Sequence, residues 1–114
     1  MSGPRRGEIW LVEFGRPVGR EQAGRRPAVV VVSADPLNDS RAGVVIVVPC
    51  TRTRRGLASH VELDPASTGL DYISFAKCED VKSVSEERLV ARLGVTPLDA
   101  MFEIARSLRY LLEL

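Results

Sequence analysis

The chain has 114 residues, about the usual size of one compact domain, so we expect a single domain over residues 1–114. Hydrophobic residues make up 45% and charged residues 27%, which argues against a disordered chain. The longest uninterrupted apolar run, residues 44–50, is far shorter than the ~20 residues of a membrane-spanning helix. No signal-peptide pattern is visible, and we therefore predict a cytoplasmic protein without a membrane partner.

The net charge of +1 hides an uneven distribution of arginines. Residues 15–26 and 51–56 together hold seven arginines and one glutamate, so the rest of the chain is net acidic. The planar guanidinium group suits phosphate, and two such segments that met in space would form a basic surface for an anionic polymer. Two solvated loops that never meet are the alternative. With two cysteines and one histidine, the chain lacks the spacing of a zinc site, and we expect neither metal nor cofactor.

The first half of the chain predicts strands separated by polar loops. Residues 8–14 are rich in β-formers and predict a strand, whereas residues 15–26 form a long loop of the kind that tends to be functional. Residues 27–33 are a β-branched run without alternation, typical of a strand buried on both faces. A turn or short helical turn is expected at residues 34–43.

Further strands are expected before a terminal helix. The sequence predicts a strand at 44–48 that stops at Pro49, a loop at 50–57, a strand at 59–63 and a turn at 64–69. Residues 72–76 and 78–84 predict either two strands or a single bent strand. A last strand is expected at 89–93, ended by Gly94.

The C-terminal helix carries the clearest signals. Thr96 is expected to cap it, with Pro97 at the first helical position and Asp99 completing a capping box. An apolar stripe predicts packing on the core, and its members are Leu98, Met101, Ile104, Ala105, Leu108, Leu111 and Leu112. Short strands followed by one helix indicate a small β-barrel or curled antiparallel sheet with a terminal helix.

The residue types leave few catalytic mechanisms open. Glycine-rich phosphate loops and a G-x-S-x-G elbow are absent from the sequence, and its single histidine excludes a two-imidazole ribonuclease within one chain. Arg25 and Arg26 precede one buried strand, and Thr51 follows the other. If these strands pair antiparallel, a guanidinium and a hydroxyl share one rim and suit a phosphodiester. On RNA the 2′-hydroxyl would supply the nucleophile. Arginine and threonine are also common at strand edges for structural reasons.

At these residues the sequence resembles the MazF/PemK family of bacterial toxins. The likeness extends over nearly the whole chain in the same order. It is carried by RGEIW at 6–10, GREQAGRRPAVVV at 19–31, VVPCT at 47–51, HVEL at 60–63, VKSV at 81–84 and RL at 88–89.

The resemblance implies a mainly β fold of the α+β class, a small SH3-like β-barrel of the MazF/PemK/CcdB type with a C-terminal α-helix. It implies the toxin of a type II toxin–antitoxin system that forms homodimers and binds a MazE-like antitoxin with an acidic C-terminal tail. It also implies a sequence-selective, metal-independent endoribonuclease that cleaves single-stranded RNA. Attack by the 2′-hydroxyl would leave a 2′,3′-cyclic phosphate and a 5′-hydroxyl.

The resemblance assigns catalysis to Arg26 and Thr51. The residues for which we expect RNA contacts are Arg20, Glu21, Gln22, Arg25, Arg52, Glu79 and Lys82. Arg20 replaces a family serine, and Asp80 follows Glu79 where the family has a glutamine, so the preferred RNA sequence is open. Two alternatives are a non-catalytic CcdB-like toxin acting on a protein such as DNA gyrase, and an RNA-binding module without turnover.

Overall fold

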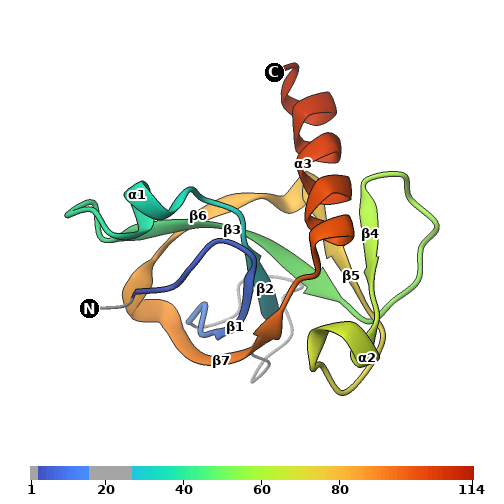
Figure 1. Cartoon of the computed structure of the whole chain (residues 1–114), viewed down its shortest axis with the longest axis horizontal. Helices are drawn as coiled ribbons and strands as arrows, with labels where there is room; N and C mark the ends of the chain where they lie inside the picture. Colours follow the sequence, from blue (N-terminus) through green and yellow to red (C-terminus); the bar gives the residue numbers. More distant parts are fainter. Residues whose placement is uncertain (1–2, 16–26) are drawn as a thin grey trace.

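A computed structural model describes residues 3–15 and 27–114 (Figure 1). In chain order its elements are β1 (Glu8–Val12), β2 (Ala28–Val31), α1 (Asp35–Asn38), β3 (Val44–Thr51), β4 (His60–Leu63), α2 (Pro65–Thr68), β5 (Ser74–Lys77), the 3-10 turn η1 (Cys78–Asp80), β6 (Lys82–Ser85), the 3-10 turn η2 (Glu86–Arg88), β7 (Leu89–Val95) and α3 (Leu98–Leu112).

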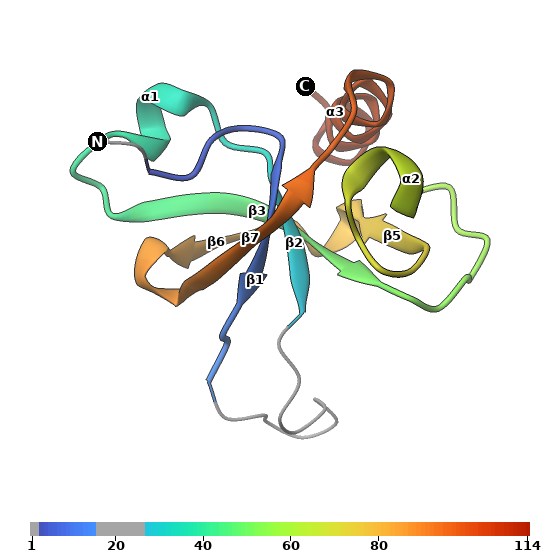
Figure 2. The same cartoon turned by 60° about the horizontal axis from the view of Figure 1, so that its bottom comes forward.

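All strand pairs are antiparallel, in the order β4-β5-β3-β2-β1-β7, with β6 also paired to β3. Figure 2 shows the strands fanning out around β3, which crosses the molecule and belongs to both halves of the sheet. Within the described residues the pairing does not close into a ring. The α+β class and the curled sheet with a terminal helix agree with the sequence-based prediction.

Strand β2 is buried on both faces, as its unbroken valine run predicts. Val30 points into a core cluster shared with α3, whereas Val29 and Val31 point into a second cluster on the opposite face. All three valines are fully buried. Successive side chains of a strand alternate between its faces, so this four-residue strand contributes side chains to two separate core clusters.

Pro49 does not stop β3, contrary to the expectation from the sequence. The strand runs to Thr51 because the proline occupies a gap between two partners: Val44 to Val47 pair with β6, and Cys50 is the next residue to pair on that edge, with β5. The Val32 N–H donates to the Ile46 carbonyl, so by alternation Pro49 turns its missing N–H away from β2 and into this gap.

Helix α3 begins without the predicted capping box. Its N-cap is Pro97, no side chain caps the helix, and Leu98 is its first residue. The Thr96 N–H instead donates to the Gly7 carbonyl at 2.7 Å, which holds Thr96 beside β1. This placement leaves the Thr96 hydroxyl buried and without a hydrogen-bond partner in the described parts of the chain. The capping prediction was therefore wrong.

Only part of the predicted apolar stripe of α3 packs on the core. Ala100, Met101 and Ile104 are buried against β4 and η1, but Leu98 is 81% exposed and Leu112 is 54% exposed. Leu112 lies in the second half of α3, which extends beyond the sheet in Figure 1, whereas Leu98 is the first residue of the helix. The prediction of core packing was wrong for Leu98 and Leu112, and also for Leu111, which is 39% exposed.

One predicted turn and the end of one predicted strand also need correction. Residues 65–68 form the short helix α2 instead of a turn, since the Asp64 carboxylate accepts a hydrogen bond from the Ala66 N–H at 3.0 Å and caps its first turn. Strand β7 continues past Gly94 to Val95. A Cβ at Gly94 would lie 1.9 Å from the Thr68 carbonyl oxygen, so the glycine marks the close packing of α2 against β7.

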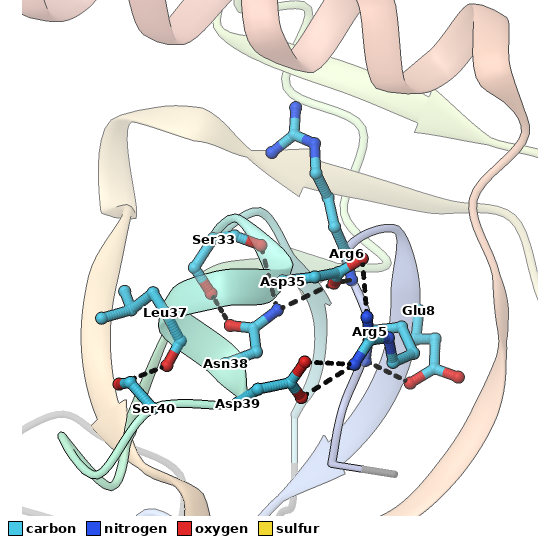
Figure 3. Close-up of polar contacts among 9 residues, drawn as sticks. All are labelled: Arg5, Arg6, Glu8, Ser33, Asp35, Leu37, Asn38, Asp39 and Ser40. Carbon is cyan, nitrogen blue, oxygen red and sulfur yellow. Dashed lines mark hydrogen bonds and ion pairs between the residues drawn. The ribbon is translucent and has the colours of Figure 1, made fainter.

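Polar contacts attach α1 to the start of the chain (Figure 3). The buried Ser33 hydroxyl donates to the Asn38 side chain, whose amide donates back to the Ser33 carbonyl at 3.0 Å. The Arg5 guanidinium contacts Asp39 at 2.8 Å and Asp35 at 3.1 Å. The residues before β1 thereby hold α1 in place next to β3, and Figure 2 shows α1 away from the other two helices.

The Glu79 carboxylate joins η1 to the start of β4. It accepts a hydrogen bond from the Ser59 hydroxyl at 2.7 Å and contacts Nε2 of the buried His60 at 2.9 Å. Partial burial raises the pKa of Glu79, but the hydrogen bonds from Ser59 and His60 outweigh this effect and lower it from 4.5 to about 2. The carboxylate therefore stays ionised at neutral pH.

No helix within residues 3–15 and 27–114 is long and apolar enough to cross a bilayer.

We predict that Gly94→Ala lowers the free energy of unfolding by about 1–3 kcal/mol, because the new methyl group must displace the Thr68 carbonyl. Urea unfolding at neutral pH measures the change. Gly3→Ala is the matched control, since its Cβ would meet ordinary contacts at 3.5 Å and beyond. Equal stability of the two variants would contradict the close approach.

We predict that Glu79→Ala lowers the free energy of unfolding by about 1–2 kcal/mol at pH 7. The folded-state pKa lies below the ordinary value, so this contribution is complete above pH 4.5 and is lost as the pH falls toward 2. Thermal melts of both proteins across this range measure it, with the exposed Glu103→Ala as control. A difference between wild type and Glu79→Ala that stays constant down to pH 2 would refute the assignment.

Candidate active-site groove

A groove of about 1120 Å³ opens where β2 begins and β3 ends. Pairing of Val29 with Pro49 sets the register and brings the two strand ends together, as the antiparallel arrangement requires. Pro27 and Thr51 both line the groove. The remaining lining residues with polar or aromatic side chains are Phe14, Arg52, Thr53, Asp71, Tyr72, Ser74, Lys77, Asp80 and Lys82, together with Cys50.

Thr51 is the last residue of β3, and its half-buried side chain lines the groove. Pairing with Phe75 of β5 fixes its backbone, and its hydroxyl accepts a hydrogen bond from the Thr53 N–H at 3.2 Å. That contact uses the hydroxyl as an acceptor, so its proton is available for donation to a ligand oxygen.

Cations and aromatic rings share the walls of this groove. The Arg52 Cζ atom lies 4.0 Å from the centroid of the Tyr72 ring, and the Lys82 Nζ atom lies 4.7 Å from that of Phe14. The Lys77 ammonium forms an ion pair with Asp80 at 2.9 Å. Flat rings and positive charges in one groove are suited to the bases and phosphates of a single strand.

The thiol of Cys50 also lies in the groove, beside Thr51. Burial raises the pKa of this thiol to about 12. It is therefore protonated at neutral pH, and the thiolate needed for nucleophilic attack is scarce.

A second groove, of about 1250 Å³, lies between β4 and α3, but its charge is wrong for a polyanion. Its ionisable lining side chains include Glu62, Asp64, Asp99 and Glu103, against Arg106 and His60. Four carboxylates would repel phosphates, whereas Arg52, Lys77 and Lys82 outnumber Asp71 and Asp80 in the groove at Thr51. The smaller groove is therefore the candidate for RNA.

The structure brings Arg52 and Lys82 to the groove beside Thr51, as predicted for RNA contacts. Glu79 does not line this groove and contacts Ser59 and His60 instead, so its RNA contact stays a prediction. The other predicted site residues lie outside the described residues: Arg20, Glu21, Gln22, Arg25 and Arg26. Whether the two arginine-rich segments form one basic surface is therefore untested.

Three groove residues were missed by sequence reasoning: Phe14, Tyr72 and Lys77. The sequence places Tyr72 in a strand, but β5 begins only at Ser74, and Tyr72 lies more than half exposed before it. An aromatic residue in a polar segment beside Gly69 and Asp71 was the available signal.

No cluster of three His, Cys, Asp or Glu side chains suitable for a metal ion occurs among the residues that the structure covers. Independence from metal stays a prediction.

Comparison with known proteins identifies the family. Residues 5–112 match the family model described as "PemK-like, MazF-like toxin of type II toxin-antitoxin system". The chain is 44% identical over 91 residues to the probable endoribonuclease MazF5 of Mycobacterium tuberculosis, covering 80% of this chain and 76% of that protein. It is 32% identical over 111 residues to the endoribonuclease MazF2 of Mycobacterium bovis, covering 96% of each.

Solved structures show the same fold. The crystal structure of MazF (Form-I) from Deinococcus radiodurans superposes with a TM-score of 0.81 at 23% identity, with both chains fully covered. The MazE-MazF (Form-II) crystal structure from the same organism gives a TM-score of 0.82 at 23% identity, covering 100% of this chain and 99% of that one. With its fold, its groove at Thr51 and a family match over nearly its whole length, the chain belongs to the PemK-like, MazF-like toxins of type II toxin–antitoxin systems.

Proposed function

We propose that this chain is a MazF-family endoribonuclease that cleaves single-stranded RNA in the groove at Thr51. The observation that carries the proposal is the placement of the Thr51 hydroxyl in one groove with Arg52, Lys77 and Lys82. The relatives at 44% and 32% identity are endoribonucleases by name, which supports the same activity here.

The proposed reaction is an internal transesterification. The 2′-oxygen of the ribose attacks the adjacent phosphorus and loses its proton to a base, for which Glu21, a water molecule and the phosphate itself are the candidates. The bond to the 5′-oxygen breaks, and that oxygen takes up a proton. The products are a 2′,3′-cyclic phosphate and a 5′-hydroxyl. The substrate supplies its own nucleophile, so the mechanism requires no metal.

Two side chains would stabilise the charge that builds on phosphorus. The Thr51 hydroxyl would donate a hydrogen bond to a non-bridging oxygen, and the Arg26 guanidinium would neutralise the developing negative charge. Arg26 directly precedes Pro27, which lines the groove opposite Thr51. The residues proposed to hold the RNA strand on either side are Arg20, Glu21, Gln22, Arg25, Arg52, Glu79 and Lys82.

We assign the protein two partners besides cytoplasmic RNA. The first is a cognate MazE-like antitoxin whose acidic C-terminal tail would occupy the same groove and block it. A solved neighbour is an endoribonuclease in complex with its cognate antitoxin from a mycobacterial species, with a TM-score of 0.77 at 20% identity. The second partner is another copy of this chain.

A homodimer is supported by the uncovered face of α3. Leu98 is 81% exposed and Phe102 is 75% exposed, and their spacing of four residues places both on one face of the helix. Large apolar side chains so exposed are typical of surfaces that another protein covers.

We predict that the purified protein cleaves mixed-sequence single-stranded RNA in the presence of a chelator. Sequencing the cut ends is expected to reveal a short preferred sequence, and end-specific enzymes to detect 2′,3′-cyclic phosphate and 5′-hydroxyl termini. Intact RNA at all protein concentrations, together with inhibition of DNA gyrase, would support the CcdB-like alternative instead.

We predict that Arg26→Ala and Thr51→Ala each lower kcat/KM for this cleavage by about 100-fold or more, because each removes one group that stabilises the transition state. Thr51→Ser keeps the hydroxyl and should retain most of the activity. Arg41→Ala, an exposed arginine in the turn before β3, is the matched control for loss of positive charge. Wild-type activity in Thr51→Ala would remove the hydroxyl from the mechanism.

We predict that the wild-type protein has twice the mass of one chain in light-scattering measurements at micromolar concentration. Phe102→Ser should shift it to the monomer, since the variant removes an apolar contact from the exposed face of α3. Tyr110→Ser, which changes an equally exposed residue on the side of the second groove, should leave the mass unchanged. A monomeric wild type would contradict the dimer.

A further inference from the structure

A stacked pair of side chains lies next to Thr51 in the candidate groove. Arg52 follows β3 directly, and Tyr72 lies in the segment between α2 and β5. The Arg52 Cζ atom is 4.0 Å from the centroid of the Tyr72 ring, and both residues line the groove. Pairing of β3 with β5 brings these two segments together, because Thr51 is opposite Phe75 in the register.

The Tyr72 ring is presented to solvent more than its contact with Arg52 requires. Tyr72 is 56% exposed, whereas Phe14, the other aromatic residue of the groove, is half-buried. Burying an aromatic ring normally stabilises a protein, so an exposed ring with a cation held flat beside it is a surface suited to another planar group. Bases of single-stranded RNA are such groups, and they stack on aromatic rings and on guanidinium planes.

We propose that Tyr72 and Arg52 form a stacking subsite for one nucleobase beside the cleaved linkage. This inference rests on the proposed function, because it takes single-stranded RNA as the ligand of the groove. Arg52 is the neighbour of Thr51 in the chain, so the stacked base belongs to a nucleotide close to the phosphate that Thr51 contacts. Tyr72 thereby determines the position of the RNA strand in the groove, and Arg52 adds positive charge beside the phosphate backbone of the RNA.

The other two cation–aromatic pairs among the described residues lack this combination. The Arg54 Cζ atom lies 4.8 Å from the centroid of the Phe75 ring, but Phe75 is only 6% exposed and Arg54 is held by Glu62 at 3.1 Å. At Phe14 the cation is a lysine, Lys82, whose ammonium group offers no plane on which a base can stack.

The test measures coupling between Tyr72 and individual bases. Short oligonucleotides carrying 2′-fluoro groups lack the nucleophile and stay intact, so their binding to the full chain can be followed by fluorescence anisotropy. One series contains the best-bound single-stranded sequence and versions in which each base in turn is replaced by an abasic site. Each is titrated with wild type, Tyr72→Ala, Tyr72→Phe and Tyr72→Leu.

Tyr72→Ala should weaken binding of the intact sequence by about tenfold, within the range known for one base stacked on an aromatic side chain. Against the oligonucleotide that lacks the stacked base, the same variant should bind within about twofold of wild type, because the partner of the ring is already gone. Tyr72→Phe should bind like wild type. Arg52→Ala, titrated in the same way, should also weaken binding of the intact sequence. Arg54→Ala is its matched control and should leave binding unchanged, because Arg54 is held by Glu62.

Three results would overturn the subsite: equal weakening by Tyr72→Ala on every abasic oligonucleotide, wild-type binding by Tyr72→Ala, or full binding by Tyr72→Leu, which keeps apolar bulk without a ring. Unchanged melting temperatures show that the variants fold. If wild type binds RNA but leaves it uncut, the proposed function fails and the coupling still decides this inference. If wild type binds no single-stranded RNA, both are contradicted.

Discussion

The antiparallel pairing of β2 with β3 is the constraint on which the rest of the structure depends. It places the start of one buried strand opposite the end of the other, and this creates the groove that contains Thr51. The valines of β2 fill two cores on opposite faces, so the strand cannot rotate without exposing apolar side chains. Pro49 fixes the register further, because a shift would bring its missing N–H against a neighbouring strand.

The sequence predicted those parts of the fold that depend on local pattern. The valine run identified β2, because a strand buried on both faces has apolar residues at every position. The apolar period of three to four residues identified α3, because a helix buried along one stripe has apolar residues at that spacing. Pro49, Gly94 and Thr96 were misjudged, since each depends on a neighbour distant in the chain: a gap between β6 and β5, the Thr68 carbonyl, and the Gly7 carbonyl. Local rules contain no information on such neighbours.

The same division holds for the site. Thr51 was found because it follows a strand whose partner is evident from the pattern, and the groove contains it as expected. Tyr72 and Lys77 reach the groove through the pairing of β5 with β3, and no motif in the sequence predicts this pairing. Glu79 shows the reverse case. The sequence likeness assigns it to RNA, whereas its carboxylate is engaged by Ser59 and His60 between η1 and β4.

Strand β3 changes its pairing partner at Pro49, beside the candidate site. On one side of Pro49 the strand is held by β2, and on the other side Cys50 and Thr51 are held by β5. The surroundings of Thr51 are therefore built from two strands that are distant in the chain. Substitutions at Tyr72 or Lys77, next to or in β5, can change the wall of the groove while the pairing of β2 with β3 stays intact.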